Sequence, residues 1–124
     1  MILADTDVLI AYLAGIEPAA AQVKSYIESD SLQTTAINCF ELLSGAGEGK
    51  RADAIRRLVA ATSMIPVDRE AATHAAMVRR QLSSKGFSIG MGDCLIAGTA
   101  LANDLPLLTR NRKHFEHVEN LTLL

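Results

Sequence analysis

Four polar residues, far apart along the chain, each stand beside an apolar segment: Asp5, Glu41, Asp93 and Asn111. Carboxylates brought together repel one another, by about 4 kcal/mol for two unit charges about 4 Å apart at an effective dielectric constant of about 20. No lysine or arginine adjoins any of the three acids in sequence, so a bound cation is the simplest way to offset that repulsion. Oxygen ligands with some water retained suit Mg²⁺ or Mn²⁺ better than zinc. Such a site transfers or hydrolyses phosphate esters, because the cation activates water and holds the attacking and leaving oxygens.

Each of the four residues also has a simpler explanation. Asp5 is typical of a turn and Glu41 of an exposed helix surface. Asp93 and Asn111 stand where residues that cap helices stand. Only their joint placement in the fold favours a common site.

The segments that must position these residues alternate between short apolar runs and longer segments with helical periodicity. We expect short strands at residues 2–4, 32–36, 64–67, 106–109 and 121–124. We expect helices at residues 7–14, 18–29, 37–43, 51–61, 68–86, 94–102 and 111–117, with caps at Thr6 or Asp7, at Asp68 and at Asn111. This alternation, without two-residue hairpin signals, is typical of a parallel sheet. We therefore predict one domain over residues 1–124, a three-layer α/β sandwich with a mainly parallel central sheet.

The helix that follows Asp93 is almost wholly apolar. Residues 94–102 should therefore form a buried helix with Asp93 at its entrance. In parallel sheets, ligands bind at the carboxyl ends of the strands, and both Asp5 and Asn111 follow strand ends. Glu41 lies one turn into a helix that leaves a third strand end. We expect the three acids and Asn111 to meet at one edge of the sheet.

Composition narrows the class of protein. With 124 residues, 49% of them hydrophobic and 21% charged, and a net charge of −2, the chain fits a globular domain without a uniformly basic surface. Cys39 and Cys94 are too few and too far apart for a disulfide framework or a zinc site, so we expect buried free thiols in a reducing compartment. No segment approaches the about 18 apolar residues that a membrane span requires. We expect a soluble cytoplasmic protein.

Four motifs, in order, are similar to those of the PIN-domain ribonucleases, and specifically of the VapC-type toxins of toxin–antitoxin pairs. They are Asp5-Thr6-Asp7 after a short strand, Glu41-Leu42 followed by Gly45, Asp93-Cys94-Leu95-Ile96-Ala97, and Leu108-Thr109-Arg110-Asn111 with Phe115. The resemblance covers essentially the whole chain. It implies a Mg²⁺-dependent endoribonuclease, with Mn²⁺ as a substitute, in which Asp5, Glu41 and Asp93 bind the metal. It also implies a homodimer inhibited by a small cognate antitoxin, with DNA contacted only through that antitoxin.

One position departs from the family pattern. The family often has a fourth acid where this chain has Asn111, which leaves open whether one or two metals bind. Asn111 can still orient a water molecule, so we keep it among the catalytic candidates. Asp7 is a candidate to replace the missing acid, and Thr109 is a second auxiliary candidate.

RNA contacts are expected from basic residues rather than from aromatic ones. The chain has no Trp, two Tyr and three Phe, which is few for a base-stacking surface. Arg110, Arg112 and Lys113 lie beside the expected site and are candidates for phosphate contacts. His114 and His117 are three residues apart, but a zinc site needs further soft ligands that are absent nearby.

Two other classes of protein fit part of the pattern. Asp5 and Asp7 after an apolar strand resemble the paired acids of haloacid-dehalogenase-like phosphatases, but only Lys85 approximates their lysine, and Glu41 would have no role. A receiver-type signalling domain has a similar length and an acidic Mg²⁺ pocket. It would need a phosphoacceptor at a central strand end, for which Asp68 is a poor match, and a late lysine that is absent.

Overall fold

The sheet at the centre of the fold is fully parallel. The computed structural model describes residues 1–124, and its strands are β1 (Ile2–Ala4), β2 (Leu32–Thr35), β3 (Ser63–Ile65) and β4 (Leu107–Leu108). They lie in the order β3-β2-β1-β4. In the central strand, Leu3 pairs with Gln33 on one side and with Leu107 on the other. The carboxyl ends of all the strands therefore point to the same edge of the sheet.

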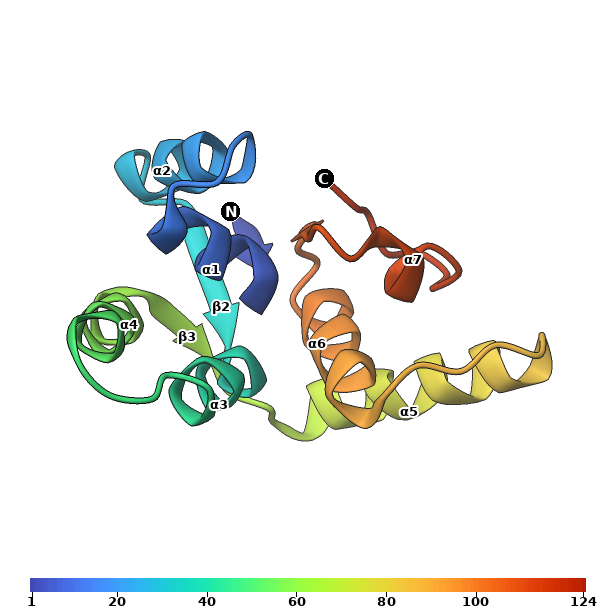
Figure 1. Ribbon diagram of the computed structural model, residues 1–124. Helices are drawn as coiled ribbons and strands as arrows, with labels where there is room; N and C mark the ends of the chain where they lie inside the picture. The colour runs from blue at the N-terminus through green and yellow to red at the C-terminus, as the bar shows by residue number, and fades with distance from the viewer.

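Helices connect the strands and cover both faces of the sheet. They are α1 (Thr6–Ala14), α2 (Ala19–Glu28), α3 (Ala36–Ser44), α4 (Lys50–Ala61), α5 (Arg69–Ser84), α6 (Met91–Ala102) and α7 (Arg112–Phe115). Figure 1 shows α1, α2 and α4 on one side of the strands and α5, α6 and α7 on the other.

Strand β1 separates two hydrophobic cores. Ile2 and Ala4 belong to the core that includes Leu9 of α1, whereas Leu3 belongs to the core that includes Ile96 of α6. This alternation follows from the strand itself, because successive side chains point to opposite faces. The three-layer α/β sandwich expected from the sequence is confirmed.

The buried helix α6 packs closely on α5 through one glycine. A Cβ atom on Gly98 would lie 2.5 Å from the backbone nitrogen of Ala75 and 2.6 Å from the carbonyl oxygen of Ala71. Only a residue without a side chain allows the two backbones to approach so closely. This contact fixes α6, and with it the acidic residue in its first turn.

Two of the expected helix caps are wrong. Asp5, rather than Thr6 or Asp7, caps α1, because its side chain accepts the N–H of Thr6. Asp93 does not stand at the entrance of its helix, since α6 begins two residues earlier, at Met91, with Gly90 as its extended N-cap. The carboxylate of Asp93 lies within the first turn and is free for other contacts. The cap of α5 by Asp68 is confirmed.

Several element boundaries also differ from expectation. Strand β3 ends before Pro66, whose ring nitrogen has no hydrogen to donate to a neighbouring strand. The last expected strand, at residues 121–124, is reduced to one bridge between Leu107 and Leu123. Cys39 and Cys94 are free and buried, as expected. No helix combines the length and the apolar character needed to cross a membrane.

Candidate active site

Asp5 is the most deeply buried of the acids, with 6% of its surface exposed. Its Oδ1 accepts hydrogen bonds from the backbone nitrogen of Thr6 at 2.8 Å and from Nδ2 of Asn38 at 3.1 Å. Its Oδ2 accepts one from the hydroxyl of Thr109 at 2.8 Å. These donors hold the carboxylate at the carboxyl end of β1.

Burial dominates the electrostatics of Asp5. Burial is the largest cause that raises the pKa of Asp5; the negative charges of Asp7 and Asp93 also raise it, the bonds from Thr109 and Thr6 lower it, and the net pKa is about 6. A raised pKa means that the charged form lacks compensation in its surroundings. A cation bound beside Asp5 would therefore stabilise its charged form.

Glu41 is tied to the same region by a side chain from α1. The hydroxyl of Thr6 donates a hydrogen bond of 2.7 Å to Oε1 of Glu41, across 35 positions of sequence. The other oxygen, Oε2, lies 3.8 Å from the position that a Cβ atom on Gly92 would take. Glu41 of α3 therefore faces the first turn of α6, next to Asp93.

Asp93 is half-buried and is oriented by a histidine. Nδ1 of His114 lies 2.7 Å from Oδ2 of Asp93. The same nitrogen lies 2.8 Å from Nδ2 of Asn111. Asn111 occupies the N-cap position of α7 but makes no side-chain cap, because its amide is directed at His114. The structure thus places Asn111 and Asp93 around one imidazole ring.

Asp7 and Thr109 connect the ends of β1 and β4. The carboxylate of Asp7 accepts the backbone N–H of Arg110 at 3.2 and 3.1 Å. The hydroxyl of Thr109, besides donating to Asp5, accepts the backbone N–H of Asn111 at 2.9 Å. Asp7 therefore anchors the turn that carries Asn111.

The donor set suits a hard cation in an open site. Each of Asp5, Glu41 and Asp93 is held mainly through one oxygen and keeps lone pairs on the other. No lysine or arginine forms an ion pair with any of them. No three or more His, Cys, Asp or Glu side chains lie together closely enough in this structure to hold a metal ion by themselves. Water would complete the coordination shell, which is the usual pattern for Mg²⁺.

The basic residues expected to contact RNA differ in their surroundings. Arg110 and Lys113 are exposed, and Arg110 directly follows Thr109 of the site. A guanidinium nitrogen of Arg112 donates to the carbonyl of Leu124 at 3.0 Å. Arg112 is thus partly engaged by the end of the chain.

Sequence reasoning missed the polar residues that hold the acids, namely Thr6, Asn38 and His114. Asn38 lies one helical turn before Glu41, on the buried side of α3. A polar side chain among apolar neighbours at that spacing was the available signal. The sequence pattern suggests a role for His114 only as a zinc ligand.

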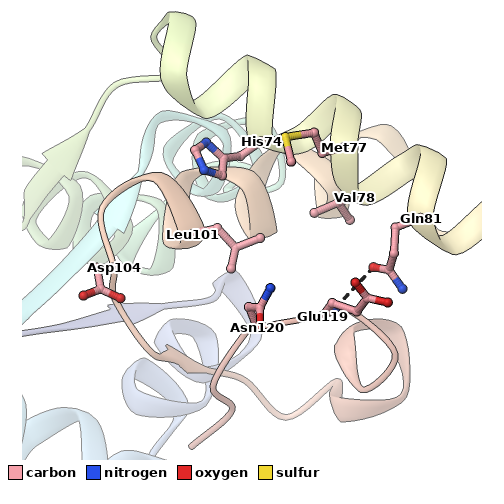
Figure 2. Close-up of a pocket in the computed structure, with 8 residues that line it drawn as sticks. All are labelled: His74, Met77, Val78, Gln81, Leu101, Asp104, Glu119 and Asn120. Carbon is pink, nitrogen blue, oxygen red and sulfur yellow. Dashed lines mark hydrogen bonds between the residues drawn. The ribbon is translucent and has the colours of Figure 1, made fainter.

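A separate cavity of about 350 Å³ lies away from these acids. Figure 2 shows it between α5, the end of α6 and the segment that carries Glu119 and Asn120. None of the acids of the site lines it. A hollow of this size suits a small molecule rather than a polymer.

Comparison with known proteins decides the family. The sequence model of the PIN domain matches residues 2–121. The chain belongs to the PIN-domain family. It is 36% identical over 121 residues to ribonuclease VapC10 of Mycobacterium tuberculosis, covering 98% of this chain and 90% of the relative. It is 26% identical to the tRNA(fMet)-specific endonuclease VapC of Shigella flexneri, covering 94% and 91%. The expected resemblance to VapC-type PIN domains is confirmed.

Solved structures agree with the fold of this PIN domain. The complex VapBC2 of Rickettsia felis, bound to a DNA fragment from its promoter, contains a chain that matches with a TM-score of 0.84 and 23% identity, covering 100% of this chain and 98% of that one. FitAcB of Neisseria gonorrhoeae matches with a TM-score of 0.80 and 25% identity, covering 100% and 97%.

Proposed function

We propose that this PIN domain is a Mg²⁺-dependent endoribonuclease and the toxin of a type II toxin–antitoxin pair. The observation that carries the proposal is the placement of Asp5, Glu41 and Asp93. The acids lie at the end of β1, on α3 and on α6, at one edge of the sheet. Glu41 and Asp93 each keep one oxygen without a hydrogen bond there, and Oδ2 of Asp5 accepts only one, from Thr109. The names of its relatives, a ribonuclease and a tRNA-specific endonuclease, support RNA as the substrate.

Asp5, Glu41 and Asp93 would hold the cation, which lowers the pKa of water and offsets charge on the phosphate. Water then attacks phosphorus, one P–O ester bond breaks, and the leaving oxygen becomes a hydroxyl. The products are a phosphate monoester end and a hydroxyl end, without a 2′,3′-cyclic phosphate. Arg110 and Lys113 would contact phosphates of the RNA, and Arg112 would do so less, because Leu124 engages it.

The structure weakens the two alternative functions. A haloacid-dehalogenase-like phosphatase would leave Glu41 without a role, whereas Thr6 ties Glu41 into the hydrogen bonds around Asp5. A receiver domain would need Asp68 as its phosphoacceptor. Oδ1 of Asp68 instead accepts the N–H of Ala71 at 2.9 Å as the cap of α5.

A protein partner is part of the proposal. The similar solved structures include toxin–antitoxin complexes, some of them bound to DNA. Phe40 and Met91 are 68% and 66% exposed, and aromatic and methionine side chains are enriched where proteins contact a partner. We propose a cognate antitoxin and a homodimer, with DNA contacted only through the antitoxin. The free thiols of Cys39 and Cys94 fit a cytoplasmic location.

The experiment uses purified protein, structured RNA and sequencing of the RNA ends. We expect cleavage with Mg²⁺ or Mn²⁺, none in EDTA, and recovery when the metal is restored. Ends that carry a 2′,3′-cyclic phosphate would contradict water as the nucleophile. The toxin role is tested separately, by expression with and without the adjacent gene. Normal growth without that gene would exclude the toxin role and leave the nuclease activity standing.

A further inference from the structure

Asn38 is a fully buried polar side chain, with 0% of its surface exposed, in the first turn of α3. Its Oδ1 accepts hydrogen bonds from the backbone nitrogen of Thr35 at 3.3 Å and from the Thr35 hydroxyl at 2.7 Å. The opposite amide orientation would put Oδ1 against a carboxylate oxygen of Asp5, and two acceptors repel each other. Thr35 therefore fixes which way the Asn38 NH₂ group points.

The NH₂ group of Asn38 donates in two directions. One hydrogen bond goes to Oδ1 of Asp5 at 3.1 Å and the other to the hydroxyl oxygen of Thr6 at 2.9 Å. The Thr6 hydroxyl has a single proton, which it donates to Oε1 of Glu41 at 2.7 Å. Each N–H or O–H group in this series of hydrogen bonds is thus committed to one acceptor. The series links two acids, Asp5 and Glu41, that are 36 positions apart in sequence.

We propose that Asn38 is a positioning residue that sets the carboxylates of Asp5 and Glu41 in one fixed geometry for the catalytic cation. This inference rests on the proposed function. Asn38 and the Thr6 backbone occupy Oδ1 of Asp5, and the Thr6 hydroxyl occupies Oε1 of Glu41. The oxygens left for a cation are Oδ2 of Asp5, which also accepts from Thr109, and Oε2 of Glu41.

Residue 38 can position both acids only if its side chain is uncharged and donates two hydrogen bonds from one nitrogen, as the NH₂ group of Asn38 does. An aspartate at this position would add a buried negative charge beside Asp5, and a leucine would leave both acceptors without their donor. Outer-shell contacts of this kind change metal affinity by about 10- to 100-fold when they are removed. Because Asn38 is fully buried, it cannot contact RNA, and its loss should not weaken RNA binding directly.

The test is Mn²⁺ binding by calorimetry, with RNA cleavage as a second measurement. We expect Asn38→Leu to weaken Mn²⁺ binding by about tenfold or more. Thr6→Val removes the next hydrogen bond of the series and should have a similar effect, while Thr6→Ser keeps the hydroxyl and should restore binding.

The double variant of Asn38→Leu and Thr6→Val should bind Mn²⁺ no more than about threefold more weakly than either single variant, because both substitutions break the same series of hydrogen bonds. In the cleavage measurement, kcat of the Asn38→Leu variant at limiting Mn²⁺ should fall, while its KM for RNA stays within about twofold of the wild-type value.

Asn38 also belongs to the capping box of α3, so its loss lowers stability as well. Asp68→Ala is the matched control, because it removes the cap of α5 without touching the acids. It should lower the melting temperature and leave Mn²⁺ affinity unchanged. If Asn38→Leu fails to fold, the pair Thr6→Val and Thr6→Ser decides the outcome.

Two results would overturn the inference. If wild-type protein binds Mn²⁺ and the folded Asn38→Leu and Thr6→Val variants bind it equally well, Asn38 has only a structural role, and the proposed metal site stands. If wild-type protein binds no Mn²⁺, both the inference and the proposed metal site are wrong.

Discussion

Nδ1 of His114 lies 2.7 Å from Oδ2 of Asp93, although the two residues belong to α7 and α6. A ring nitrogen so close to a carboxylate oxygen must carry the proton, because two acceptors repel each other. The contact of the same nitrogen with Nδ2 of Asn111 at 2.8 Å then cannot be a hydrogen bond at the same time. His114 is therefore a donor to Asp93, and the amide of Asn111 is left to reorient toward water or a cation.

This geometry predicts the effect of replacing His114. His114→Leu removes the donor that orients Asp93 and should weaken Mg²⁺ activation of RNA cleavage by about tenfold. His114→Gln offers an amide donor from a side chain of similar length and should retain more activity. The measurement is the Mg²⁺ concentration that gives half-maximal cleavage. Equal values for the leucine variant and wild type would show that His114 does not position Asp93.

The stability of the metal-free protein should depend on Asp5. Burial raises its pKa to about 6 from 3.8, so the folded state holds this proton more tightly than the unfolded state does. The protonated carboxyl group of Asp5 contributes fully to stability below about pH 4. This contribution is lost as the pH rises through about 6, which lowers the free energy of unfolding by about 3 kcal/mol. Asp5→Asn removes this cost and should stabilise the protein in EDTA at pH 8 but not at pH 4.

Denaturant unfolding in EDTA at both pH values measures this effect. Glu48→Gln is the matched control, because Glu48 is exposed and contacts none of the acids. It should change the free energy of unfolding by less than about 0.5 kcal/mol at either pH. A gain from Asp5→Asn that is the same at pH 4 and pH 8 would contradict the assignment of the cost to the Asp5 charge.

The close packing of α5 and α6 makes Gly98 a sensitive position. A methyl group there would meet the backbone of Ala75 at 2.5 Å, and backbone cannot move aside as a flexible side chain can. Gly98→Ala should therefore destabilise the protein by about 3 kcal/mol or more. Gly90→Ala is the control, since nothing lies within 4 Å of its added methyl group, and it should cost less than about 1 kcal/mol. Equal melting temperatures for the two variants would exclude this helix contact.

Asn111 provides a test of metal stoichiometry. Asn111→Asp adds a charge beside Asp93 and His114, so Mn²⁺ binding at low salt should tighten by about fivefold or more. Asn103→Asp adds the same charge at the opposite end of α6 and should leave Mn²⁺ binding unchanged. Calorimetry measures the affinity and the number of sites together. An unchanged affinity in the Asn111 variant would place residue 111 outside the cation's surroundings.

The sequence predicts the layers of this fold well, because its signals are local. The apolar run before Asp5 and the small residues of α6 each carry their own local pattern, and both elements form, although α6 begins at Met91 rather than at Cys94. The hydrogen bonds between distant side chains were not predictable in the same way. Whether the Thr6 hydroxyl reaches Glu41 or another acceptor depends on the register of α1 against α3, which no local pattern encodes. The caps failed for a related reason, since Ser, Thr and Asp at neighbouring positions are equally good cap residues.

The central claim is that Asp5, Glu41 and Asp93 hold a divalent cation that makes this PIN domain an RNA hydrolase. Its most direct test is cleavage of structured RNA by wild-type protein and by Asp93→Asn across a Mn²⁺ titration, with the circular dichroism of both proteins compared. We expect wild-type cleavage to require Mn²⁺. The cleavage rate of the Asp93→Asn variant should fall by more than about 100-fold, the largest loss expected from a residue that only supports a metal ligand, while its circular dichroism spectrum stays unchanged. Full cleavage by the folded variant, or by wild-type protein in EDTA, would contradict the claim.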